Sequence, residues 1–270
     1  MMDTQKKIAI IGAGNLGVAI AKGMVANDMV QPKNIYLTRR HLEKLDSLKP
    51  EGFQITSDNK KAVEGCEYII LCVQPKQLPA VLKEIEPALD AESHIFISTI
   101  TGISISTIEE HLDITLPIVR AMPNTAIAIS ESMTCMCASN ASEDQLKEVQ
   151  QIFKALGETL IIDENLMKAA TVLAASGIAF FLRYIRAATQ GGIQLGFHAE
   201  EAQKIAMQTA RGAASLLVEE HNHPETEIDK VTTPQGCTIA GLNEMEHQGL
   251  SSALIKGILT SFEKINTITK

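Results

Sequence analysis

The chain of 270 residues has no excess of positive charge, because 24 lysines and arginines stand against 32 aspartates and glutamates. Nucleic acids and anionic membrane surfaces are bound by basic patches, so a formal net charge of −8 argues against both partners. With 45% hydrophobic and 21% charged residues, the composition excludes a disordered, collagen-like or disulfide-scaffold chain. We expect one large globular domain or two modest ones.

Paired cysteines are also missing, since the five cysteines are odd in number and include no CxxC pair. This pattern is typical of reduced thiols, and it predicts a cytoplasmic protein. His221, His223 and Cys237 do not have the compact spacing of a metal-binding motif, so we predict no metal site.

Long apolar runs are scarce. The apolar residues near the N-terminus superficially imitate a signal peptide, but three glycines and Asn15 interrupt them. The longest other run, residues 169–182, has 14 residues and meets Arg183, whereas a membrane-spanning helix needs about 20. We therefore expect neither a signal peptide nor a membrane-spanning segment.

Up to about residue 162, short β-branched runs alternate with segments of helical periodicity. This alternation is typical of a mostly parallel sheet with helices on both faces. Ser142 and Gln145 form a capping box, which predicts a helix that begins there and stops at Gly157. The expected strands are 8–11, 35–38, 68–73, 95–98, 118–120, 133–138 and 159–162, and the expected early helices are 15–26, 40–48 and 77–85.

After residue 162 the pattern is helical and no further strand is expected. Asp163 is placed to cap a long helical stretch, and a polar connector is expected at 220–227. The further helices are expected at 199–219, 238–247 and 251–268. The predicted fold class is therefore α/β, with a Rossmann dinucleotide-binding domain at 1–162 and an all-helical domain at 163–270.

A GxGxxG motif follows the first expected strand and opens the first expected helix, which is the setting that dinucleotide binding needs. Its glycines allow a tight turn, close backbone approach to a pyrophosphate, and packing of helix on strand. Free N–H groups at the helix N-terminus can then bind the anion. A tight turn without a ligand is the alternative. The predicted diphosphate-binding residues are Gly12, Ala13, Gly14, Asn15, Leu16 and Gly17.

The end of the second expected strand distinguishes the two nicotinamide cofactors. An NAD site usually places an acidic residue there, but this chain has Thr38, Arg39 and Arg40. A guanidinium can pair with a ribose 2′-phosphate, which a carboxylate would repel. We predict NADP(H) as the cofactor, with use of NAD(H) left open. The alternative is that one arginine caps the next helix or is only solvated.

A second anion site is predicted where the loop 231–238 leads into a helix. Hydroxyl groups and a glycine at a helix N-terminus suit a small carboxylate. Thr238 could cap this helix and still offer its hydroxyl to a ligand. An ordinary helix cap without a substrate is the other interpretation.

These motifs together resemble the pyrroline-5-carboxylate reductase family, whose enzymes complete proline biosynthesis. The resemblance covers essentially the whole chain, and its most specific part is the block VTTPQGCTIAGLNEME that begins at Val231. It implies a Rossmann domain and a helical domain that dimerises through interleaved helices, and such dimers often form decamers. The other matching pieces are IIGAGNLGVAI at 10–20, VQPK at 73–76, RAMPNT at 120–125, and the dipeptides at 176–177 and 223–224.

The resemblance also implies roles for single residues. Thr233, Thr238 and the backbone of Cys237 would hold the substrate carboxylate, and Thr238 would also lie near the imine nitrogen as the catalytic residue. The other implied residues are Gly236 in the substrate loop, Asn59 near the adenosine ribose, Val73, Gln74 and Pro75 along the cofactor, and Met122 and Asn124 in the loop beside the nicotinamide.

The chain departs from the family's usual residues at several positions. Gln235 stands where a glycine is usual, and this change restricts the backbone of the substrate loop. The other departures are Ala126 and Ile178 for prolines, Ser130 and Ser132 for glycines, and Ala174 and Ala175 for a Ser-Gly pair.

The predicted reaction is NADPH-dependent reduction of 1-pyrroline-5-carboxylate to L-proline by hydride transfer to a protonated cyclic imine. Water can protonate such an imine, so the site needs positioning groups more than a strong general acid. His223 suits a solvated turn better than an acid, and Asn124 could order the nicotinamide amide or cap a turn. The alternatives are a similar reductase of another imino or hydroxy acid, and a noncatalytic NADP(H)-binding sensor.

Overall fold

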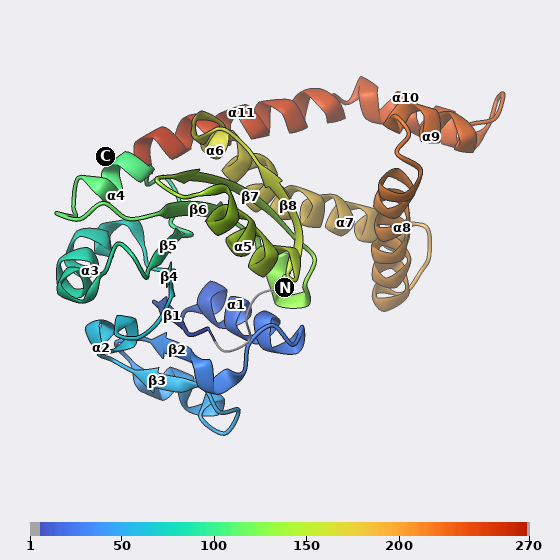
Figure 1. The fold of residues 1–270 in the computed structure, drawn as a ribbon. Coiled ribbons are helices and arrows are strands. Elements are labelled where there is room, and N and C mark those ends of the chain that lie inside the picture. The colour runs from blue at the N-terminus through green and yellow to red at the C-terminus, as the bar shows by residue number, and fades with distance from the viewer. Residues whose placement is uncertain (1–5, 269–270) are drawn as a thin grey trace. The chain divides into compact units, whose positions relative to one another are not determined.

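The computed structural model describes residues 6–268 and divides into two compact units (Figure 1). The first unit contains the residues up to Ser176 together with those from Phe262 on, and the second is Gly177–Ser261. The predicted boundary between residues 162 and 163 stays a prediction.

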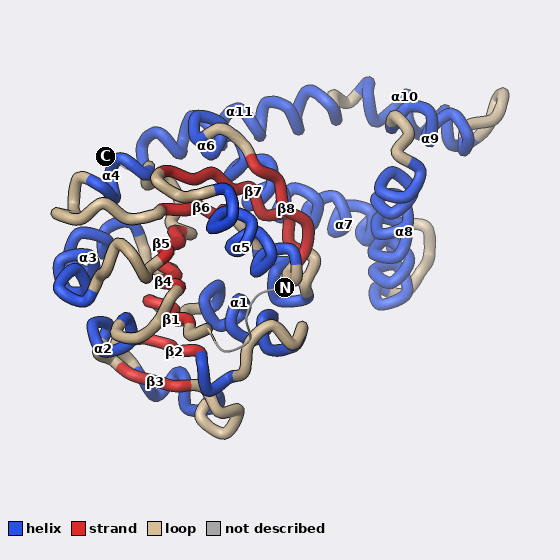
Figure 2. Tube along the Cα trace, in the orientation of Figure 1, coloured by secondary structure: helices blue, strands red, loops and turns tan. Residues whose placement is uncertain are grey.

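The first unit is built on an eight-stranded sheet in the order β3-β2-β1-β4-β5-β6-β7-β8 (Figure 2, red). All neighbouring strands are parallel except β6 and β7, whose connection is too short for a parallel crossover. The mostly parallel sheet is therefore confirmed. The strands are β1 (Ile8–Ile11), β2 (Ile35–Thr38), β3 (Gln54–Thr56), β4 (Tyr68–Leu71), β5 (Ile95–Ser98), β6 (Ile118–Met122), β7 (Ser132–Ser139) and β8 (Gly157–Ile161).

Helices cover both faces of the sheet, as expected. The predicted helix 40–48 is a 3₁₀ helix, Leu42–Leu48, and the capping box of Ser142 and Gln145 starts α5. The α-helices of this unit are α1 (Asn15–Ala26), α2 (Asn59–Val63), α3 (Leu78–Ile85), α4 (Ile105–Glu109), α5 (Glu143–Lys154) and α6 (Met167–Ala170). Shorter 3₁₀ turns are Pro32–Asn34, Pro75–Gln77, Glu86–Ala88, Thr125–Ile129 and Glu164–Leu166, and a π-helical turn spans Thr171–Ser176.

Two hydrophobic cores lie on opposite faces of the sheet because alternate strand residues point in opposite directions. In β1, Ile8 and Ile10 pack with α1 and α5, whereas Ala9 and Ile11 pack with α2, α3 and α4. Strands β1, β4, β5 and β6 are buried at every residue, which explains their nearly continuous apolar sequences. The cores hold the carboxyl ends of the strands at fixed positions along one edge.

The second unit is helical. It contains α7 (Gly177–Gln194), α8 (Ala199–Glu220), α9 (Pro224–Val231), α10 (Cys237–His247) and most of α11 (Leu250–Ile268). Helices α7 and α8 pack closely, since a Cβ added to Gly192 would lie 2.9 Å from the Cβ of Ala202. The predicted connector 220–227 is wrong from Pro224 on, because Pro224 starts α9 and the Nδ1 of His223 accepts a hydrogen bond from the backbone N–H of Glu225.

The helical run Glu164–Gln194 has 31 residues and an 18-residue window of mean hydropathy 1.5, of which 22% is buried. By length and composition alone it could cross a membrane, although no membrane-spanning segment was expected from the sequence. Arg183 and Arg186 lie in this run and would be costly inside a bilayer. Phe181, Leu182 and Tyr184 are exposed, so a single chain leaves this apolar helix partly uncovered.

Candidate cofactor and substrate sites

The predicted cofactor residues follow the carboxyl ends of parallel strands. The glycine turn comes after β1, Arg39 after β2, Asn59 after β3 and Val73 after β4, while Met122 ends β6. Because these strands run in parallel, the residues share one edge of the sheet. The strand order reverses between β1 and β4, and ligands of open α/β sheets bind at such a point.

The glycine turn has no room for side chains on its protein side. Gly12 has φ +92°, and an added Cβ would lie 2.6 Å from Val73 Cγ1 and 2.9 Å from the carbonyl oxygen of Cys72. An added Cβ at Gly17 would lie 2.9 Å from Ile10 Cγ2, so this glycine lets α1 pack on β1. At Gly14 the nearest atom would be 4.0 Å away, which leaves that position open for a ligand.

Thr38 and Arg39 tie the end of β2 to the glycine turn. The hydroxyl of Thr38 accepts a hydrogen bond from the N–H of Gly12 at 3.2 Å, and its carbonyl accepts one from the N–H of Ala13 at 2.7 Å. The guanidinium of Arg39 donates to the carbonyl oxygen of Ala13 at 3.1 Å. The turn and the predicted phosphate-binding arginine therefore form one hydrogen-bonded unit.

A cavity of about 410 Å³ opens beside this turn. Gly14, Asn15 and Arg39 line it, together with Lys22 and Lys44. Arg40 is exposed and is not among the lining residues. The two lysines were missed by sequence reasoning, because no local motif marks them. A glycine cradle next to clustered cations fits a dinucleotide that carries an additional phosphate.

Asn59 and the segment Val73–Pro75 have internal partners. The carboxamide of Asn59 donates to Glu84 Oε2 at 2.9 Å, so this side chain is held against α3. The backbone N–H of Gln74 donates to Gln77 Oε1 at 3.0 Å, and Pro75 starts a 3₁₀ turn. These contacts fix the loops along which the cofactor is expected to lie.

Asn124 is buried and serves as a cap. Its Oδ1 accepts from the N–H of Ala126 at 2.9 Å, and its Nδ2 donates to the carbonyl oxygen of Ala174 at 3.3 Å. Ala174 belongs to the π-helical turn, a feature that often occurs at functional sites. The sequence left two roles open for Asn124, ordering the nicotinamide amide or capping a turn, and these hydrogen bonds show the turn cap. Met122, also buried, ends β6 just before this loop.

The serines that replace the family's usual glycines make hydrogen bonds. Ser132 Oγ accepts from the backbone N–H of Asn124 at 3.0 Å, and Ser130 Oγ accepts from Asn27 Nδ2 at 3.2 Å. Ser130 has φ +57°, a conformation that favours glycine. Through its hydrogen bond to Asn124, Ser132 supports the Asn124 loop, a role that the sequence did not reveal.

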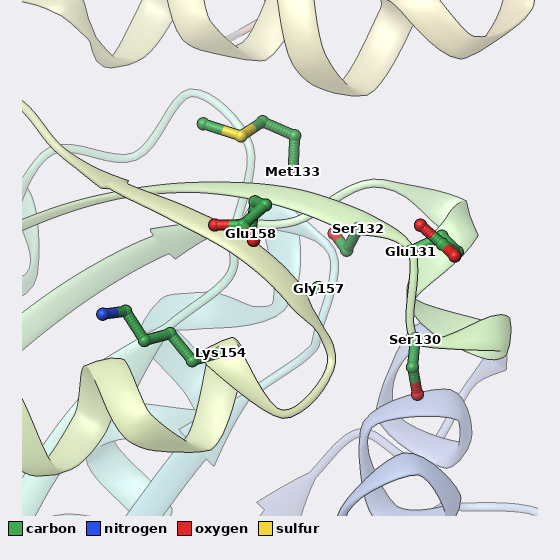
Figure 3. Close-up of a pocket in the computed structure, with 7 residues that line it drawn as sticks. All are labelled: Ser130, Glu131, Ser132, Met133, Lys154, Gly157 and Glu158. Atoms are coloured by element: carbon green, nitrogen blue, oxygen red, sulfur yellow. The ribbon is translucent and has the colours of Figure 1, made fainter. Parts of the chain in front are cut away.

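Ser130 and Ser132 also lie on the wall of a cavity of about 450 Å³ at the start of β7 and β8 (Figure 3). The charged side chains of Glu131, Lys154 and Glu158 lie around it. None of the predicted site residues lines this cavity.

Arg120, at the start of the RAMPNT motif, forms a buried ion pair. Its side chain is 6% exposed, and its Nη1 lies 2.7 Å from Glu164 Oε1. The same carboxylate oxygen accepts a hydrogen bond from the backbone N–H of Ile105 at 2.7 Å. Burial raises the pKa of the nearby Cys137 thiol to about 11, although the charge of Arg120 opposes that shift. The pair joins β6, α4 and the chain segment before α6.

In the substrate loop the structure corrects one expectation. The N-cap of α10 is Gly236, without a side-chain cap, and Thr238 is the second residue of the helix. The N–H of Gly236 donates to the carbonyl oxygen of Thr233 at 2.9 Å, and an added Cβ there would lie 2.4 Å from Thr233 Oγ1. The exposed Cys237 and Thr238 thus lie in the first turn, where backbone N–H groups are free to bind an anion. Within residues 6–268, no group of three or more His, Cys, Asp or Glu could hold a metal ion.

Gln235 has φ +60°, in the left-handed region that favours glycine. Relief of that strain is worth about 1–2 kcal/mol and is partly offset by the flexibility of glycine in the unfolded chain. We expect Gln235→Gly to raise the free energy of unfolding by about 0.5–1 kcal/mol in denaturant titrations. Gln248, with φ −79°, is the matched control, and Gln248→Gly should lower stability. A loss of stability in Gln235→Gly would contradict the strain.

Comparison with protein families identifies both parts of the chain. A model described as "Pyrroline-5-carboxylate reductase dimerisation" matches residues 164–268, and one described as "NADP oxidoreductase coenzyme F420-dependent" matches residues 7–102. The chain is 51% identical over 269 residues to pyrroline-5-carboxylate reductase 1 of Dictyostelium discoideum. The aligned region covers 95% of this chain and 49% of that protein. It is 50% identical to reductase 2 of the same organism, over 97% of this chain and 93% of that protein. The chain belongs to the pyrroline-5-carboxylate reductase family.

A crystal structure of Plasmodium falciparum pyrroline carboxylate reductase with NADP bound has the same fold, with a TM-score of 0.90, 24% identity and complete coverage of both chains. As a member of the reductase family, the protein is an NAD(P)H-dependent oxidoreductase of proline biosynthesis with an N-terminal NADP-binding domain. The predicted family, fold class, enzyme class and cofactor are confirmed. Its helical part is the family's dimerisation domain. The chain spans about half the length of one Dictyostelium relative and nearly all of the other.

Proposed function

We propose that this reductase converts 1-pyrroline-5-carboxylate to L-proline with NADPH as the hydride donor. The substrate loop carries the proposal, because a glycine-capped helix N-terminus with Thr233 and Thr238 beside it is suited to a small carboxylate. The glycine turn and the cationic cavity support NADPH as its partner. The assignment of each residue to its role is part of this proposal.

The residues of the first unit would hold the cofactor. The N–H groups of the glycine turn bind the diphosphate, and Arg39 meets the 2′-phosphate. Asn124, held by Ser132 and Ala174, keeps the loop after β6 in a fixed position beside the nicotinamide. When bound, the reduced nicotinamide supplies the hydride.

The residues of the second unit would hold the substrate. The N–H of Cys237 and the hydroxyls of Thr233 and Thr238 bind the carboxylate, and Thr238 also lies near the imine nitrogen. Water protonates the imine, which makes its carbon a better hydride acceptor, so no buried acid has to be supplied. The protein contributes by bringing the two reacting carbons to about 3–3.5 Å, within one chain or between two chains.

We further propose that the reductase is a cytoplasmic homodimer and that its dimers assemble into decamers. The exposed apolar side chains of the dimerisation domain, among them Phe181, Leu182 and Leu254, support the dimer. In a dimer such a face is covered by the partner instead of by lipid or water.

Substitution of Thr238 tests the reaction. We expect Thr238→Ala to lower kcat/KM for pyrroline-5-carboxylate by about 100-fold, because a charge-assisted contact to the substrate is lost, while the Kd for NADPH stays unchanged. The measurement follows the absorbance of NADPH. Thr226→Ala, an exposed threonine on α9, is the control and should keep full activity.

Two results with the unmodified enzyme would contradict the proposal. Binding of NADPH without its oxidation would favour a sensor, and oxidation only with another imino or hydroxy acid would favour a reductase of different specificity. Equal activity of Thr238→Ala and the unmodified enzyme would remove Thr238 from the site.

A further inference from the structure

The cavity beside the glycine turn is lined by three cations, Lys22 of α1, Arg39 after β2, and Lys44 of the 3₁₀ helix Leu42–Leu48, and none of its lining residues is acidic. The overall charge of the chain is negative, so this local concentration of positive charge is not a consequence of composition. An anion of more than one charge is the chemistry that such a cavity favours.

The three cations differ in how far their charge is already compensated. Lys22 Nζ lies 2.8 Å from Glu51 Oε1, so Lys22 already has a carboxylate as its ion-pair partner. Arg39 donates only to a carbonyl oxygen, that of Ala13, so its positive charge is held in place and not cancelled. Arg39 is therefore available for an anion.

Lys44 forms no ion pair among the residues that the structure describes, although acidic residues lie on both sides of it in sequence. Glu43 Oε1 lies 3.3 Å from His41 Nδ1, and Asp46 Oδ1 lies 2.6 Å from Lys49 Nζ. Both neighbouring carboxylates face other partners, which leaves the ammonium of Lys44 uncompensated at the wall of the cavity.

The position of Lys44 is set by the hydrophobic core. Leu45 and Leu48 are 0% and 3% exposed, and they anchor the short helix under the sheet. Lys44 directly precedes Leu45 and lines the cavity. Arg40 lies before the start of the helix and does not line the cavity. Of the two neighbouring arginines, Arg39 lines this cavity and Arg40 does not.

We infer that Lys44, together with Arg39, binds the 2′-phosphate of NADP(H), and that Lys44 and not Arg40 is the second cation of this subsite. A phosphate monoester carries about −1.5 to −2 charges at pH 7, which one guanidinium does not balance. Lys44 is thereby a residue that sets the preference for NADPH over NADH. The inference rests on the proposed function only in taking NADPH as the ligand.

The test compares two ligands that differ by this one phosphate, adenosine 2′,5′-bisphosphate and adenosine 5′-monophosphate, by titration calorimetry. In Lys44→Gln we expect the Kd of the bisphosphate to rise about tenfold and that of the monophosphate less than twofold. The Kd of NADPH, followed by fluorescence, should also rise about tenfold while that of NADH stays constant. Lys33→Gln removes one exposed charge elsewhere in this unit and should change neither.

Lys44→Arg keeps the charge and should retain most of the affinity for the bisphosphate. An unchanged bisphosphate Kd in Lys44→Gln, an equal loss for both ligands, or a larger loss in Arg40→Gln would each overturn the inference. These outcomes are independent of turnover. If the enzyme oxidises NADPH with pyrroline-5-carboxylate but Lys44→Gln leaves the Kd values unchanged, only this inference fails. If the enzyme binds NADPH through Lys44 but shows no turnover, only the proposed reaction fails.

Discussion

Replacement of Glu164 by alanine is expected to lower the free energy of unfolding by about 2–3 kcal/mol. The variant leaves the guanidinium of Arg120 buried without its carboxylate, and it leaves the N–H of Ile105 without its acceptor. Loss of one partner of a buried ion pair typically costs about 3–5 kcal/mol, and the partial exposure of Glu164 reduces that value. The expected fall in the thermal midpoint is about 5–10 °C.

The control for this prediction is Glu110→Ala, an exposed glutamate at the end of α4, which should shift the midpoint by less than about 2 °C. Glu164→Gln should lie between the two, because the amide oxygen can still accept from Arg120 and Ile105. The melts are measured without cofactor, since a bound ligand would raise the midpoint. A Glu164→Ala midpoint equal to that of the control would show that the pair adds nothing to stability.

Most strands could be predicted because a sheet covered on both faces demands apolar residues in nearly every position. Strand β3 could not, since it has three residues and its Gln54 and Thr56 are polar. Helix α9 was not predicted either, because its sequence is also polar. The polar residues after Pro224 read as a connector, but a proline at the first helical position and a capping histidine start a helix there.

The candidate site shows where sequence reasoning stops. The glycine turn could be predicted because its backbone geometry demands those residues locally. The choice between Arg39 and Arg40 depends on the turn after β2, and the location of Lys44 depends on how Leu45 is buried, neither of which has a local signal. Ser132 supports Asn124 through a contact that exists only once β6 and β7 have paired.

Alanine substitutions at Gly12 and Gly14 should separate folding from cofactor binding. Gly14 has φ −84°, and its added Cβ would meet no atom nearer than 4.0 Å, so Gly14→Ala is expected to fold with an unchanged thermal midpoint. Its methyl group would occupy the place where the pyrophosphate approaches the backbone. We expect the Kd of NADPH to rise at least about 100-fold, because the N–H groups of the turn can no longer reach the anion.

Gly12→Ala should show the opposite result, with its main effect on stability instead of on cofactor binding. The new methyl group would lie 2.6 Å from Val73 Cγ1 in a backbone conformation, φ +92°, that L-residues rarely adopt. Strain and overpacking together are expected to cost about 3 kcal/mol before any ligand is added. Thermal melts without cofactor and NADPH fluorescence titrations distinguish the two variants. Tight NADPH binding by Gly14→Ala would mean that the diphosphate does not lie against this turn, and the assignment of the cofactor to the edge after β1 would then fail.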